Sequence, residues 1–104
     1  MSFRRYEILL PIRYNDGVPV DEEHFTQTRK ELVKEFGAVT WCAERLQGMW
    51  SHEGEVFANA NIKAVIDAED TPEARAFFRR FKQTLKSRFR QIDIWMVSYP
   101  IEIH

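Results

Sequence analysis

The sequence predicts one α+β domain over residues 1–104, with strands and helices in the order β-α-β-β-α-β. Three observations carry this prediction. The 104 residues leave room for a single hydrophobic core. Four segments show the period-two alternation of apolar and polar residues that is typical of half-buried strands. Two further segments show helical periodicity with clear start and stop signals.

The first strand is predicted over residues 6–14, where every second residue is apolar or aromatic. Pro11 interrupts this pattern, because proline cannot donate to a sheet ladder. We therefore expect Pro11 near the end of the strand or at a bulge. The residues Asn15-Asp16-Gly17 that follow are turn formers.

The first helix begins after Asp21, a good N-cap residue, and acidic residues occupy its first turn. Val20 and Phe25 have the spacing of a hydrophobic staple across this end. Gly37 is placed to end the helix in a left-handed C-cap.

The middle of the chain predicts two strands joined by a loop. Alternation over residues 39–46 indicates the second strand, and alternation over residues 58–67 indicates the third. Residues 47–55 contain Gly48 and Gly54 with mixed polarity, so we expect them to form the connecting loop, with a short extension of either flanking strand as the alternative.

The second helix begins at Thr71-Pro72, an N-cap threonine followed by a first-turn proline, and its aromatic stripe continues to Phe89. The last strand is predicted from Ile92, with Ile92 and Ile94 facing the helices and an interruption at Pro100. This order predicts a ferredoxin-like βαββαβ plait, in which a four-stranded antiparallel sheet carries both helices on one face.

Composition excludes several classes of protein. The formal net charge of −1 shows no global attraction to nucleic acid or to an anionic membrane. A single cysteine, Cys42, excludes an internal disulfide framework, and no apolar run is long enough to span a bilayer. No phosphate-binding loop, dinucleotide fingerprint or metal-ligand spacing is present, so we expect a cytoplasmic protein without a cofactor or metal.

The neutral total charge hides a basic second helix, which carries seven bases and no acid from residue 74 to residue 92. Five of them share one arc of the helix: Arg75, Arg79, Lys82, Lys86 and Arg90. This arc fits a solvated outer face or a docking stripe for an acidic partner. Arg88 projects nearer the apolar side, so we expect it to reach solvent or to find a carboxylate.

The sheet face without helices is the first candidate binding surface. It is expected to present large apolar residues together with charges of both signs, including Asp93, and a fully hydrated face rarely does so. We predict that this face forms a homodimer or binds a partner or small ligand through Trp95, Tyr99 and Arg13. An RNA-recognition module would need aromatic residues on its central strands, where this chain has Leu9, Lys63 and Val65.

The second candidate is the expected loop at residues 47–55, where Trp50 is a further binding residue. An imidazole and a carboxylate close together can act as a general base. An enzyme is therefore the alternative function, with a cleft between the open face and this loop and with His52 or Glu53 as base. The loop matches no known catalytic spacing, which favours a non-enzymatic binding protein.

Three segments carry a resemblance that covers nearly the whole chain: residues 36–40 (FGAVT), 48–57 (GMWSHEGEVF) and 89–96 (FRQIDIWM). Through them the chain resembles a group of short bacterial proteins of similar length that have no assigned function. The resemblance implies no catalytic residue.

Overall fold

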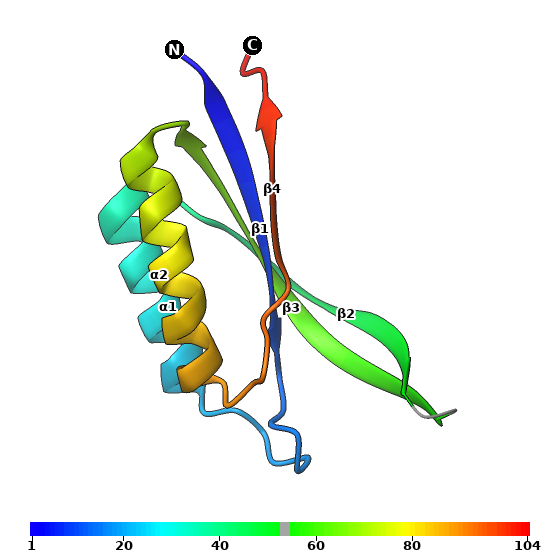
Figure 1. Cartoon of the computed structure of the whole chain (residues 1–104). Coiled ribbons are helices and arrows are strands. Elements are labelled where there is room, and N and C mark those ends of the chain that lie inside the picture. The colour runs from blue at the N-terminus through cyan, green and yellow to red at the C-terminus, as the bar shows by residue number, and fades with distance from the viewer. Residues whose placement is uncertain (53–54) are drawn as a thin grey trace.

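The computed structural model of the chain contains six regular elements: β1 (Phe3–Pro11), α1 (Glu22–Phe36), β2 (Thr40–His52), β3 (Glu55–Glu69), α2 (Pro72–Arg88) and β4 (Met96–Ile101). The structure describes the backbone of residues 1–52 and 55–104, and the side chains of residues 1–42 and 60–104. The strands form one antiparallel sheet in the order β2-β3-β1-β4 (Figure 1). This order confirms the predicted ferredoxin-like plait.

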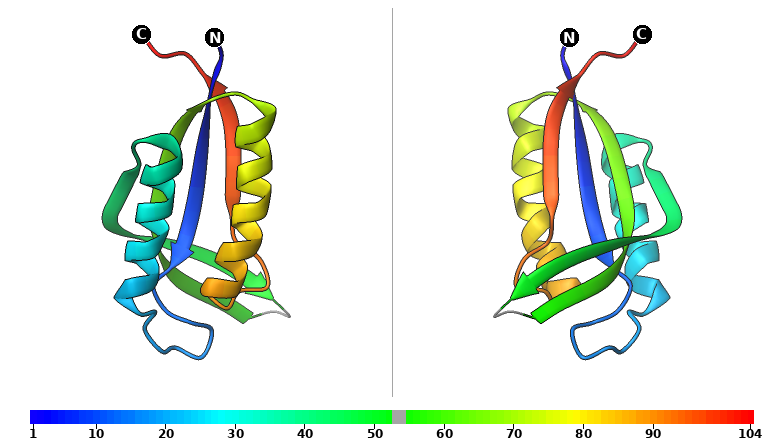
Figure 2. Two further views of the ribbon diagram at one scale, coloured as in Figure 1. Left: turned by 90° about the vertical axis from the view of Figure 1, so that its left-hand side faces the viewer. Right: turned by 90° about the vertical axis from the view of Figure 1, so that its right-hand side faces the viewer.

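Both helices cover the same face of the sheet, and the other face is left open (Figure 2). The core lies between these two layers. Its fully buried members include Ile8, Leu10, Leu32, Ile66, Phe78, Leu85, Phe89 and Ile94. The Phe78 ring connects the sheet with both helices. It belongs to α2 and stacks on Tyr6 of β1 and on Phe36 of α1, with ring centroids 3.7 and 5.0 Å away.

The helix ends follow the sequence signals with one exception. The Thr71 hydroxyl accepts a hydrogen bond of 3.0 Å from the Ala74 N–H, which caps α2 as predicted. Gly37 ends α1 with a φ of 83°, and its N–H donates to the carbonyl of Val33. Asp21 occupies the N-cap of α1, but its side chain makes no capping hydrogen bond.

Both strand prolines lie where the ladder needs no N–H. The Leu9 N–H donates to the Trp95 carbonyl, so the Pro11 nitrogen, two residues on, also faces β4, beyond the last β1–β4 pair. Pro11 is the final residue of β1, as expected for a central strand. Pro100 was expected to interrupt the last strand, yet it lies within β4. Because β4 is an edge strand, the Pro100 nitrogen faces its free side.

Strands replace the expected loop at residues 47–52 and 55, so the flanking strands extend much further than the short extension allowed for; residues 53 and 54 lie outside the described residues. β2 and β3 pair from Gln47↔Ala60 to His52↔Glu55, whereas β1 pairs with β3 only as far as Asn61. The two strands therefore continue past the sheet as a two-stranded ribbon (residues 47–52 and 55–60), which leaves on the side away from the helices (Figure 1). Cross-strand pairing overrides the weak strand propensity of Gly48. The radius of gyration, 14.4 Å, exceeds the roughly 13 Å of a compact domain this long, as an extended arm requires.

The last strand begins later than predicted. After α2, Arg90 takes a positive φ of 53° and the Gln91 N–H bonds back to the Lys86 carbonyl, so the chain turns before it enters the sheet. Ile94 is buried as expected. Ile92 is 90% exposed, in contrast to its predicted place beneath the helices. Within the described residues, neither helix is long and apolar enough to cross a membrane.

Candidate functional site

The open face of the sheet carries a network of charged side chains across β3, β1 and β4. Arg5 donates two hydrogen bonds to the Asp67 carboxylate, at 2.7 and 2.9 Å. Glu7 pairs with Lys63, and the Tyr99 hydroxyl donates to Glu7 Oε2 at 2.7 Å. The network neutralises its own charges and fixes the side chains between the apolar residues of the face.

These contacts shift the pKa values of the acids. A hydrogen bond from Lys63 is the main reason that the pKa of Glu7 is lowered, and a hydrogen bond from Arg5 lowers the pKa of Asp67. The pKa of Tyr99 is raised, chiefly because its hydroxyl donates to Glu7. The carboxylates are thus held ionised.

We expect the protein to lose stability on acidification. Glu7 and Asp67 have lower pKa values when folded than their ordinary values of 4.5 and 3.8, so their stabilising effect is complete above those values and is lost as the pH falls below them. Urea unfolding measured across a pH series should show this decline. In the double variant Glu7→Gln, Asp67→Asn, the free energy of unfolding should fall less steeply as the pH is lowered. The fall that remains is expected to come from Asp70 and Asp93, whose pKa values are also lowered. An unchanged slope would contradict a role for the open-face network.

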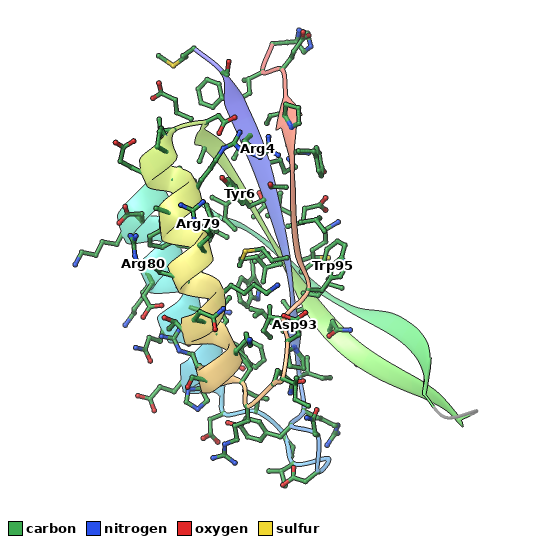
Figure 3. The ribbon with its side chains drawn as sticks, in the orientation of Figure 1. Arg4, Tyr6, Arg79, Arg80, Asp93 and Trp95 are labelled. Carbon is green, nitrogen blue, oxygen red and sulfur yellow. The ribbon has the colours of Figure 1, made fainter. Side chains whose placement is uncertain are left out.

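Apolar side chains share this face with the charged network. Leu9, Val65 and Val97 are half-buried, although no helix covers them. Trp95 is 50% exposed and Tyr99 is 39% exposed. Figure 3 shows Trp95 on the side of β4 away from the helices. The structure therefore brings Trp95 and Tyr99 together on the open face, as predicted.

Two other residues expected on this face lie elsewhere. Arg13 follows the end of β1 and donates to the carbonyl of Gly17 at 3.1 Å, because the chain turns back on itself after Pro11. Asp93 precedes β4 and pairs with Lys82 of α2 at 3.1 Å (Figure 3). Neither residue belongs to the open-face surface.

The candidates on the expected loop fall in the ribbon. Trp50 and His52 belong to β2, but their side chains lie outside the described residues, and Glu53 does so entirely. The roles predicted for these three residues stay predictions. The predicted cleft would have had the loop at residues 47–55 as one wall, but residues 47–52 and 55 belong to paired strands. Among the described residues, no three His, Cys, Asp or Glu side chains are grouped to hold a metal ion.

The basic arc of α2 is partly neutralised within the chain. Arg75 donates to both carboxylate oxygens of Asp70 at 2.8 Å, and Lys82 pairs with Asp93. Arg90 lies past the helix, with its guanidinium 4.4 Å from the centre of the Tyr14 ring. Arg88 finds a carboxylate, as expected, in Glu31 of α1.

Two arginines of β1 were not anticipated from the sequence: Arg5 of the open-face network, and Arg4, which lies on the other face. A signal was available for Arg5, because a base in one strand and an acid at the matching position of a neighbouring strand predict a cross-strand pair. That matching needs the strand register, which periodicity alone does not define.

Compared by sequence, the chain matches no protein-family model and no curated protein. Compared by structure, it is similar over nearly its whole length to several solved proteins. A divalent cation tolerance protein, CutA1, from Thermus thermophilus has a TM-score of 0.67 and 20% identity, covering 98% of this chain and 86% of that one. CutA1 from Oryza sativa has a TM-score of 0.69 and 11% identity, covering 100% and 84%.

A phage SAM lyase, solved in complex with S-methyl-5'-thioadenosine, has a TM-score of 0.68 and 14% identity and covers 98% of this chain and 90% of that one. At these identities the likeness concerns the fold alone. The neighbours include proteins named for cation tolerance and a protein named as a lyase, so the shared fold does not select a function. The chain is a small protein with the fold of CutA1.

Proposed function

We propose that the protein is a non-enzymatic binding protein that works as a homo-oligomer, at minimum a dimer, assembled through its open sheet face. The observation that carries the proposal is the apolar content of that face. Trp95 and Tyr99 are exposed beside the half-buried Leu9, Val65 and Val97. Large apolar residues on the uncovered face of a small domain favour an interface.

The ribbon supports a second copy of the chain as the occupant. Among the described residues, the ribbon bonds to β1 at its base, where the Ile12 N–H donates to the Ala60 carbonyl at 3.2 Å, and its remaining backbone pairs join β2 to β3. An isolated two-stranded hairpin is marginally stable in water. The ribbon projects on the open-face side, so a copy seated on the sheet would lie beside it (Figure 1). Its sequence includes Met49, Trp50, Val56 and Phe57, a composition suited to packing against a partner.

The charged network suits an interface between identical copies. Arg5, Asp67, Glu7 and Lys63 are paired within one chain, so covering them leaves no single charge without a counter-ion. A small ligand or partner would bind at the rim of this interface. We place the protein in the cytoplasm, since its one cysteine, Cys42, suits a reducing compartment.

We expect Trp95→Glu to dissociate the oligomer. Burying an unpaired carboxylate at the centre of an apolar interface costs several kcal/mol, and truncating a central aromatic residue removes about 2 kcal/mol or more besides. Sedimentation velocity at micromolar concentration should show the wild type as an oligomer and the variant as a monomer of about 12 kDa.

Val33→Glu is the matched control. Val33 is a 46% exposed apolar residue on α1, in the helix layer, so the same added charge should leave the assembly unchanged. A wild type that sediments as a monomer, or a Trp95→Glu variant that stays assembled, would refute the open-face interface.

A further inference from the structure

The helix side of the sheet contains a cavity of about 240 Å³ between α2, β1 and β4. Its apolar lining comes from Tyr6 of β1, Phe78 of α2, and Met96 and Val97 of β4. A second hollow, at the N-terminal end of α2, shares Arg75 and Arg79 with it. The space suits a small ligand and lies on the opposite layer from the proposed oligomer interface.

Cationic side chains surround the cavity: Arg4 of β1 and Arg75, Arg79 and Lys82 of α2. Figure 3 shows Arg4 and Tyr6 on the side of β1 next to α2, which carries Arg79. Asp70 pairs with Arg75 at 2.8 Å and lies 3.9 Å from Arg4, and Asp93 pairs with Lys82. Four cations against two carboxylates leave two positive charges in excess, and Arg79 has no ion-pair partner among the described residues.

The Tyr6 hydroxyl supplies a second, independent observation. Tyr6 is 4% exposed, and its hydroxyl has no hydrogen-bond partner in the described structure. The pKa of Tyr6 is raised, with burial as the largest cause, while Arg4, Arg75 and Arg79 oppose the shift. The hydroxyl is therefore protonated at neutral pH and can donate a hydrogen bond. A buried donor without an acceptor is unfavourable, and an anionic oxygen in the cavity would satisfy it.

We propose that this cavity binds a small phosphomonoester. A phosphate dianion would balance the two excess charges, and guanidinium groups match phosphate oxygens in geometry. The Tyr6 hydroxyl would donate to one phosphate oxygen. Phe78 and Met96 would contact a short apolar or aromatic group esterified to the phosphate. This site lies on the helix side of the sheet and shares Val97 with the proposed oligomer interface.

Isothermal titration calorimetry of the full chain with phenyl phosphate tests the proposal, with ionic strength held constant by chloride. We expect phenyl phosphate to bind more tightly than inorganic phosphate, which lacks the ring, and than benzoate, which carries one charge. Arg79→Gln should weaken phenyl phosphate binding by about tenfold or more, because it removes a charge-assisted hydrogen bond. Tyr6→Phe should weaken it by about fivefold without lowering the stability of the free protein.

Arg80→Gln is the matched control. Arg80 is the next residue of α2, is exposed and points away from the sheet (Figure 3), so its loss should change the affinity by less than about twofold. The proposal is overturned if phenyl phosphate does not bind, if benzoate binds as tightly, or if the Arg79 and Arg80 variants weaken binding equally.

Discussion

Replacing Phe78 with alanine is expected to lower the free energy of unfolding by about 4 kcal/mol. Phe78 is 2% exposed, and its ring lies between those of Tyr6 and Phe36 in two near-parallel stacks, with interplanar angles of 14° and 9°. The substitution would therefore open a void where the sheet meets both helices. Since small domains are stabilised by only about 5–15 kcal/mol, urea unfolding should show a large drop in midpoint.

Phe78→Leu is the graded control for this prediction. Leucine keeps much of the buried volume and loses the ring stacking, so the expected loss is about 1–2 kcal/mol. Both measurements need one protein concentration, because self-association changes apparent stability. Equal losses for the two variants would show that the volume of Phe78 is not what holds the layers together.

Replacing Glu31 with alanine is expected to cost about 2 kcal/mol. The Arg88 side chain is 9% exposed and donates to both oxygens of Glu31, at 2.8 and 2.9 Å, and to the hydroxyl of the buried Thr28 at 2.9 Å. Removing the carboxylate leaves a nearly buried guanidinium without its counter-ion. The expected loss of unfolding free energy is smaller than for a fully buried ion pair, because the Glu31 side chain is 34% exposed.

Urea unfolding should separate this ion pair from an ordinary surface contact. In Arg75→Ala the lost partner is Asp70, in a pair whose arginine side chain is 50% exposed, so a loss below about 1 kcal/mol is expected. The double variant Glu31→Leu, Arg88→Met should recover most of the loss, since it removes both charges together. A single Glu31→Ala variant as stable as the wild type would contradict the structural importance of the pair.

The helices and the order of elements could be predicted from the sequence, because their signals are local. Thr71 and Gly37 define helix ends through backbone groups a few residues away, and the apolar stripes define which side each helix buries. Even the partner of Arg88 was anticipated in kind, since a charge that projects toward an apolar layer needs a carboxylate or an exit to solvent.

The candidate site was predictable only in part. Alternation placed Trp95 and Tyr99 on the open face, but Asp93 and Ile92 were misplaced because the chain turns at Arg90 before it joins β1. No periodicity reports such a turn. The ribbon was mistaken for a loop because Gly48 and Gly54 weaken a strand pattern, whereas pairing with the opposite strand restores it.

The sequence by itself determined the α+β class, the order of the elements and the identity of the face left open, because these follow from local propensity and periodicity. Tertiary structure alone decided the register, and with it which charges meet. Arg5 lies opposite Asp67 and Tyr99 reaches Glu7 only once three strands are aligned. The cavity beside Tyr6 is likewise lined by Arg4 of β1, Arg79 of α2 and Ser98 of β4. Only the packing of a helix on the sheet brings these three elements together.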